Sequence, residues 1–123
     1  MLLQNFYTVH TLEQLDAQRY VAHIILNKDH AIFKGHFPDH PVTPGVCMMQ
    51  VIKELTETVL SKKLRMLRSS NVKFMALINP ETHANLKLEI DISTTAESEY
   101  KVKNVTYFDD TVALKLVSTF IAQ

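Results

Sequence analysis

The feature that most constrains the fold is a run of strict alternation between apolar and polar residues that begins at Ala84. In an extended chain Leu86, Leu88, Ile90 and Ile92 point to the same side as Ala84, and the residues between them are polar or charged. A period of two is typical of a strand with one buried and one solvated face, and such strands occur mainly in antiparallel sheets. The sequence therefore predicts a half-buried antiparallel strand here.

Further β-rich segments flank this strand. Residues 100–108 and 111–121 are separated only by Asp109-Asp110, which predicts a tight hairpin. Earlier in the chain, residues 19–27 read as a strand and residues 6–10 as a short one, whereas the extended segment 64–75 has an ambiguous pattern.

One segment, Pro44 to about Ser61, predicts a long helix. Thr43 can serve as its N-cap, which would place Pro44 at the first helical position, where a missing N–H costs nothing. The first turns are apolar nearly all round, so they must be buried on most sides. A later polar stripe of Lys53, Glu54 and Glu57 indicates that the far end reaches the surface.

These elements predict an α+β fold, with five or six antiparallel strands wrapped around one central helix. The length of 123 residues allows one core, so we expect a single domain over residues 1–123. Lys plus Arg and Asp plus Glu both number 13, so no net field attracts nucleic acid. No apolar run approaches the length of a membrane span, no signal peptide is evident, and the single cysteine fits a reducing compartment. We therefore expect a cytoplasmic protein.

The stretch FKGHFPDHPVTPG, residues 33–45, holds both glycines and three of the four prolines of the chain. The prolines make the loop stiff, and Gly45 leaves the helix start open to close approach. Free N–H groups at a helix start can hold a carbonyl oxygen that gains negative charge, and His36 titrates near neutrality. The stretch thus suggests chemistry at a carbonyl. A structural loop whose histidine binds backbone is the alternative.

The run from Gly35 to Gly45, GHFPDHPVTPG, resembles the signature of the FabZ/FabA-type β-hydroxyacyl-acyl carrier protein dehydratases, which leads directly into a long helix. A weaker resemblance covers much of the rest of the chain. It implies a hotdog fold, a homodimer, an acyl tunnel at the dimer interface, and a substrate thioester carried on the phosphopantetheine of acyl carrier protein. It implies no metal or other cofactor.

The same resemblance implies roles for individual residues. His36 would remove the α-proton, and the backbone N–H of Gly45 would hold the thioester oxygen. Phe37, Pro44 and Val46 would contact the substrate. In the family, a Glu or Asp further along the helix, supplied by the other subunit, works with the β-hydroxyl.

Position 50, where the family has that carboxylate, is Gln in this chain. A neutral amide cannot give a proton to the leaving hydroxyl, although it can hydrogen-bond it or place a water. Three hypotheses follow: a dehydratase in which His36 acts alone and forms the trans-2-enoyl product, a hotdog thioesterase, or an acyl-binding protein without turnover. Glu54 could reach back to substitute for the missing carboxylate, but we interpret it as a solvated side chain of the polar stripe.

Other residues are open to two interpretations each. The basic cluster Lys62, Lys63, Arg65 and Arg68 could dock an acidic acyl carrier protein or be an ordinary solvated surface. Cys47 is expected to be a buried small hydrophobe. Met48 and Met49 fit either an acyl tunnel or the core. No set of residues has the spacing of a metal site.

Overall fold

The computed structural model describes residues 3–34 and 41–123. Within these residues, six strands and two helices follow each other. They are β1 (Tyr7–Gln14), β2 (Arg19–Leu26), α1 (Ala31–Lys34), α2 (Gly45–Leu60), β3 (Leu64–Phe74), β4 (Asn85–Ala96), β5 (Glu99–Phe108) and β6 (Thr111–Ala122).

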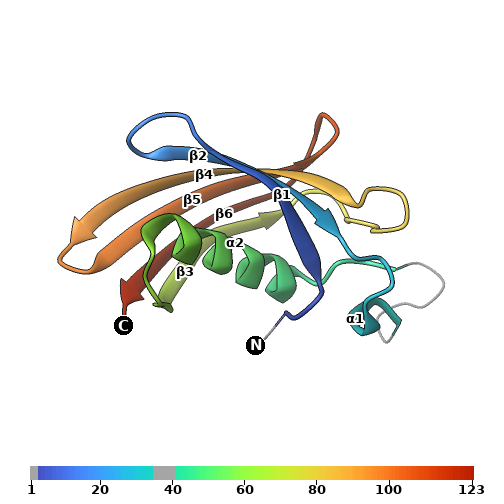
Figure 1. Ribbon diagram of the computed structural model, residues 1–123, viewed down its shortest axis with the longest axis horizontal. Coiled ribbons are helices and arrows are strands. Elements are labelled where there is room, and N and C mark those ends of the chain that lie inside the picture. The colour runs from blue at the N-terminus through green and yellow to red at the C-terminus, as the bar shows by residue number, and fades with distance from the viewer. Residues whose placement is uncertain (1–2, 35–40) are drawn as a thin grey trace.

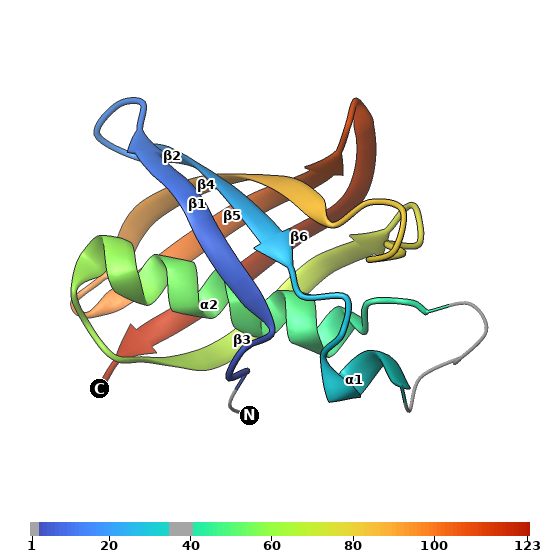
Figure 2. The ribbon, with the colours of Figure 1, turned by 45° about the vertical axis from the view of Figure 1, so that its right-hand side comes forward.

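The strands form one antiparallel sheet in the order β1-β2-β4-β5-β6-β3, so β1 and β3 are its two edges. The sheet curves over α2, and β1 crosses beside the helix on the open side (Figures 1 and 2). This arrangement confirms the predicted α+β fold with one long helix inside a wrapped sheet. Both edge strands leave main-chain groups available for pairing with another chain.

The core lies between α2 and the concave face of the sheet. The predicted alternation holds in β4, where Leu86, Leu88 and Ile90 are at most 1% exposed. The helix contributes its buried side to the same core. The fully buried residues of this core include Val51, Ile52 and Leu55 from α2 and Phe120 from β6.

Several strand boundaries differ from the predicted ones. The first strand extends to Gln14 rather than ending at His10, and a register shift between Val9 and Thr11 interrupts its alternation. The ambiguous segment 64–75 is the edge strand β3. The short helix α1 was not predicted.

The predicted helix cap is wrong by one position. Pro44, with φ −62° and ψ 140°, is the N-cap residue and makes no side-chain cap, and the helix begins at Gly45. Thr43 does not cap the helix, because its Oγ1 is buried and hydrogen-bonds to none of the described residues, while its N–H donates to the carbonyl of Ile78 at 2.8 Å. At the other end, Ser61 is a left-handed C-cap, close to the predicted end. Within residues 3–34 and 41–123, no helix is long and apolar enough to cross a membrane.

Candidate active site

The start of α2 presents backbone N–H groups that the helix cannot use. The N–H groups of Cys47 and Met48 both donate to the carbonyl of Pro44, at 3.0 and 3.3 Å. The N–H groups of Gly45 and Val46 lie in the first turn, where an α-helix has no acceptor for them, and no described residue accepts a hydrogen bond from them. With the helix dipole behind them, these two amides can hold an oxygen that gains negative charge.

A groove of about 420 Å³ opens beside these amides. Val46, Phe74 and Leu77 are large apolar side chains around it, and 59 to 74% of their surface is exposed. Apolar exposure of this kind, gathered at one place, marks a binding surface. We call this hollow the helix-start groove. Its lining is residues 42–46, Met48, Met49, Phe74, residues 76–78, Ala113 and Leu114.

The ring of Phe74 lies directly against Gly45. A Cβ atom at this position would lie 2.4 Å from Cζ and 2.6 Å from Cε1 of Phe74, distances that real Cβ atoms do not adopt. The close approach expected at Gly45 is therefore made by the Phe74 side chain, which covers the helix start from the end of β3.

Thr43 is a site residue that the sequence analysis missed. It lines the helix-start groove, it is 7% exposed, and no described residue hydrogen-bonds its Oγ1. Leaving a hydroxyl buried and unpaired costs free energy, so the side chain is suited to an oxygen or N–H of a ligand in the groove. Its position beside the Pro44-Gly45 helix start was the only available signal, and that signal was interpreted as a cap.

Gln50 lies one turn along α2 from the groove. Val46 and Met49 line both the helix-start groove and a second hollow of about 270 Å³, so the two adjoin. We call the second one the Gln50 groove. Its lining is Val46, Met49, Gln50, Lys53, Arg65, Met66 and Gln123.

Glu54 is held in place by two hydrogen bonds. The hydroxyl of Tyr7, on β1, donates to its Oε1 at 2.7 Å, and Nε2 of Gln50 donates to its Oε2 at 3.0 Å. Burial, and then the hydrogen bond to Glu54, raise the pKa of the Tyr7 hydroxyl well above its usual value. Our interpretation of Glu54 as a solvated carboxylate is therefore wrong. The spacing of four residues between Gln50 and Glu54 on a helix was the signal that could have shown their contact.

The structure brings Pro44, Gly45 and Val46 together at the helix-start groove and places Gln50 beside it. His36 and Phe37 lie outside the described residues. Within the described ranges, no three His, Cys, Asp or Glu side chains are placed to hold a metal ion.

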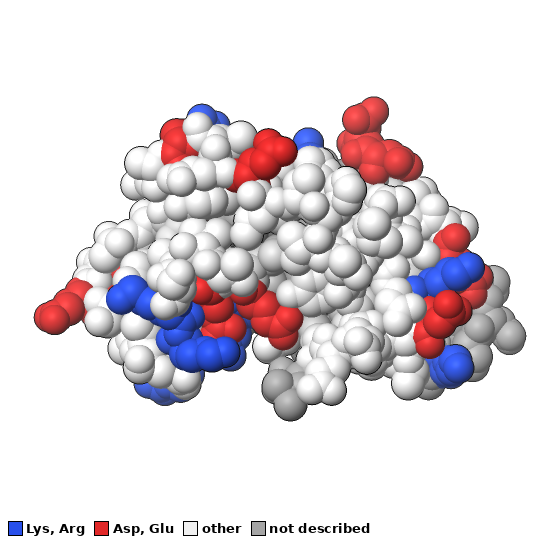
Figure 3. Space-filling model, in the orientation of Figure 1, with Lys and Arg blue, Asp and Glu red and all other residues white. Residues whose placement is uncertain are grey.

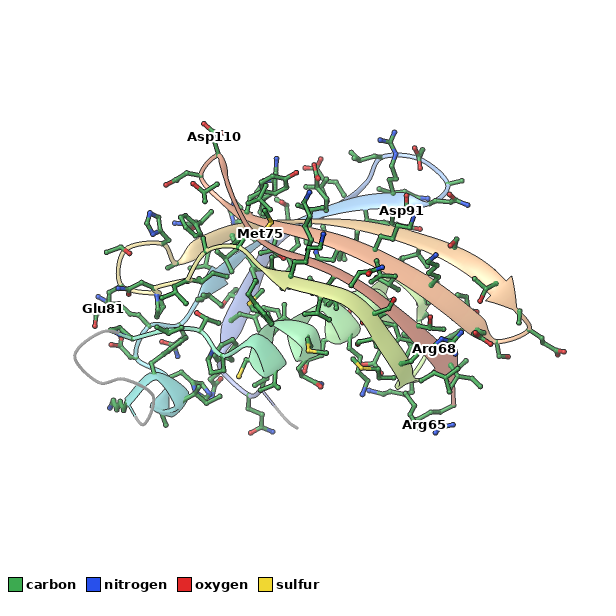
Figure 4. All side chains as sticks on the ribbon, turned by 180° about the vertical axis from the view of Figure 1, so that it is seen from behind. Arg65, Arg68, Met75, Glu81, Asp91 and Asp110 are labelled. Carbon is green, nitrogen blue, oxygen red and sulfur yellow. The ribbon has the colours of Figure 1, made fainter. Side chains whose placement is uncertain are left out.

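The remaining candidates divide between the core and the surface. Cys47 is buried, which raises the pKa of its thiol, and Met48 is buried beside it. Met49 is half-buried and faces both grooves. Arg65 and Arg68 lie in the first half of β3, away from Met75, which follows the last residue of that strand (Figure 4).

Together, the sheet wrapped around a helix and the apolar groove at the helix start define a protein with the hotdog fold. The family model of the ApeI-like dehydratases, described as ApeI dehydratase, matches residues 12–113. The chain belongs to this family.

Curated relatives include the 3-hydroxyacyl-(acyl-carrier-protein) dehydratases FabZ of Caulobacter sp. (strain K31), 27% identical over 88 residues, and of Rickettsia bellii, 30% identical over 80 residues. These matches cover 66 and 65% of this chain and 54 and 55% of the relatives. The chain thus spans about half the length of the curated relatives it matches.

Solved structures share the fold. The dehydratase heterocomplex ApeI:P from Xenorhabdus doucetiae has a TM-score of 0.74 at 20% identity and covers 93% of this chain and 96% of its own. A mutant thioesterase from Pseudomonas aeruginosa has a TM-score of 0.63 at 11% identity, covering 90% of this chain and 78% of its own. At these identities the likeness shows the hotdog fold alone.

Proposed function

We propose that this protein removes water from a (3R)-hydroxyacyl chain carried as a thioester on acyl carrier protein, giving the trans-2-enoyl thioester. The observation that carries the proposal is the pair of N–H groups of Gly45 and Val46, which have no acceptor among the described residues and lie at an apolar groove. Membership of the ApeI-like dehydratases and the FabZ relatives support the same class of reaction.

In this proposal the helix-start groove receives the substrate, with Pro44 and Val46 against it, and the family resemblance assigns a further substrate contact to Phe37. The amide of Gly45 holds the thioester oxygen. Loss of the α-proton puts negative charge on that oxygen, and fixed amide donors stabilise the charge more than they stabilise the neutral thioester. The acyl chain itself needs only apolar walls, which Met49, Phe74 and Leu77 supply.

The proton transfers are assigned to His36. Its imidazole takes the α-proton, the C–O bond to the β-hydroxyl breaks as the double bond forms, and the same proton goes to the leaving oxygen, so that water departs. Gln50 binds the β-hydroxyl but gives it no proton, because an amide is not an acid in this range of pH. No metal or redox cofactor takes part in this scheme.

A homodimer is part of the proposal. The edge strand β3 ends at the exposed Phe74 and is followed by the exposed Met75 and Leu77, so pairing of β3 with a second copy would cover main-chain and apolar groups together. The helix-start groove opens at the same place. The partner subunit's copy of the Gln50 groove would then complete the site.

The acyl carrier protein is proposed to dock on the cluster Lys62, Lys63, Arg65 and Arg68. Lys and Arg side chains gather where α2 ends and β3 begins, interspersed with acidic ones (Figure 3). Of these, Arg68 pairs with Glu99 at 3.3 Å and is mostly exposed. An acidic carrier would be attracted to this end of the molecule, and we expect the reaction in the cytoplasm, together with its carrier.

The test follows the intact mass of a β-hydroxyacyl-acyl carrier protein incubated with the purified protein and with His36→Ala. We expect the loss of one water with the wild type only, and Gln50→Glu should maintain or raise the rate. An unloaded carrier would instead establish a thioesterase. An unchanged mass over several chain lengths, with acyl affinity retained in His36→Ala, would leave an acyl-binding protein.

A further inference from the structure

Two successive hydrogen bonds link edge strand β1 to the Gln50 groove. They run from the Tyr7 hydroxyl to Oε1 of Glu54, and from Oε2 of Glu54 to Nε2 of Gln50. All three side chains are half-buried, and Tyr7 is 47 residues away from Glu54 in sequence. These two hydrogen bonds therefore depend on the tertiary fold and not only on the helix.

These hydrogen bonds fix the orientation of the Gln50 side-chain amide. Because Nε2 of Gln50 donates to Oε2 of Glu54, the NH₂ group of Gln50 is the side that meets Glu54. Tyr7 occupies the other oxygen of Glu54 as a donor. The carbonyl oxygen of Gln50 then turns away from Glu54, and no described residue donates a hydrogen bond to it.

We propose that Glu54, anchored by Tyr7, is a positioning residue that holds the Gln50 carbonyl oxygen toward the groove as an acceptor for a hydroxyl group of the ligand. This rests on the proposed function for the identity of that hydroxyl, which is the β-hydroxyl of the acyl chain. The hydroxyl donates a hydrogen bond to the Gln50 carbonyl oxygen, which leaves the lone pairs of the hydroxyl oxygen free to accept the proton from His36 as the group departs. A saturated acyl chain has nothing to offer this acceptor.

The molecule contains a matched control. On the outer face of the sheet the Tyr107 hydroxyl donates to Oε1 of Glu89 at 2.8 Å, a tyrosine–glutamate pair of nearly the same length as the Tyr7–Glu54 pair. Glu89→Gln and Tyr107→Phe make the same chemical changes as Glu54→Gln and Tyr7→Phe, at sites that line neither groove.

The first measurement concerns the Gln50 side chain itself, by NMR of isotope-labelled protein, with its amide signals assigned through Gln50→Ala. In the wild type one of the two amide hydrogens should be shifted downfield and protected from exchange. Glu54→Gln should reduce this difference, because an amide oxygen is a weaker acceptor than a carboxylate oxygen, and Glu89→Gln should leave it intact. A Gln50 signal that Glu54→Gln does not change would overturn the proposal.

The second measurement concerns the ligand. The probes are a 3-hydroxyacyl pantetheine in which an amide replaces the thioester, so that the α-proton is too weakly acidic for elimination, and its saturated counterpart. The wild type should bind the hydroxylated probe about 3- to 10-fold more tightly, the worth of one hydrogen bond. Glu54→Gln and Tyr7→Phe should reduce that preference, and the double variant Gln50→Ala/Glu54→Gln should lose no more than Gln50→Ala.

A preference that survives Glu54→Gln would refute the role of Glu54. Failure of the proposed function looks different: the wild type would release no water from the carrier-bound substrate, while the Gln50 amide and the preference for the hydroxylated probe still responded to Glu54→Gln.

Discussion

Replacing Thr43 by valine should stabilise this protein, contrary to the usual effect of changing a buried residue. Valine has the shape of threonine with a methyl group in place of the hydroxyl. Because Oγ1 of Thr43 is buried without a described partner, the native state carries the desolvation cost of that group. Such a cost is about 1 to 3 kcal/mol, and the added methyl meets an apolar groove.

We expect Thr43→Val to raise the free energy of unfolding by about 1 to 2 kcal/mol. With an unfolding entropy of about 2.1 cal/mol/K per residue over 123 residues, 1 kcal/mol corresponds to about 4 °C in Tm. Thermal and urea unfolding both measure this change. Thr56→Val is the matched control, because Thr56 is fully buried in α2 but its Oγ1 donates to the carbonyl of Ile52 at 2.8 Å.

The control variant loses a hydrogen bond, so it should not gain stability. If Thr43→Val lowered Tm as much as Thr56→Val does, the hydroxyl of Thr43 would be satisfied and the reasoning refuted. The same variant should bind the 3-hydroxyacyl pantetheine amide about 3- to 10-fold more weakly, because the ligand loses one hydrogen bond. A gain in stability with unchanged affinity would show that the hydroxyl has no part in binding.

Three further predictions concern other parts of the molecule. Gly45→Ala should push the Phe74 ring off the helix start. In urea unfolding of the wild type, Gly45→Ala, Phe74→Ala and the double variant, the two substitutions should be coupled by at least about 0.5 kcal/mol. Additive changes in the free energy of unfolding would contradict the contact. Hydrogen bonds from the backbone N–H of Gln18, then from the Arg19 side chain and backbone, lower the pKa of Asp16 to about 2, so its stabilising effect is complete above pH 4 and lost as the pH falls toward 2. The Tm difference between wild type and Asp16→Asn should therefore shrink as the pH falls from 4 to 2. A difference that stays constant would contradict the lowered pKa of Asp16. Cys47 should react with a thiol reagent only on unfolding, since burial raises its pKa, and rapid labelling of the native protein would contradict this.

The fold could be predicted where hydrophobic periodicity was strong. Apolar and polar residues alternate in β4 because one face of the strand meets the core and the other meets solvent. The tight hairpin at Asp109-Asp110 could be predicted from the two strands around it. The edge strand β3 was ambiguous because most of its residues are exposed and its pairing with β6 is interrupted by two register shifts. An edge strand that buries little has no period to detect.

The site could be predicted only in part, for a similar reason. The start of α2 comes from one local stretch of sequence, so Gly45 and Val46 were identifiable, whereas the rest of the groove lining comes from distant parts of the chain. The unpaired hydroxyl of Thr43 depends on a hydrogen bond from its own N–H to Ile78, which no local pattern reveals. The anchoring of Glu54 depends on Tyr7, and a contact across 47 residues cannot be deduced from helical spacing.

Position 50 carries an amide where the family has a carboxylate, and the effect of this difference is best tested by restoring a carboxylate at position 50. Gln50→Glu alone places a second acid where an amide now lies 3.0 Å from Oε2 of Glu54. Two carboxylates that close cannot both ionise easily, so one should keep its proton to a higher pH than an isolated acid does. The protonated form is the one that can give a proton to a leaving hydroxyl, but it competes with its neighbour for that proton.

The variant Gln50→Glu/Glu54→Gln removes the competition, because an amide at position 54 can donate to a carboxylate at position 50 over the same helical turn. If the helix needs one acid and one amide, this exchange should retain dehydration at least at the wild-type rate. The rate of Gln50→Glu alone should decline as the pH rises and its shared proton is lost. The measurement is the pH dependence of water loss from the carrier-bound substrate. Identical pH profiles for the single and double variants would show that Glu54 does not act on position 50.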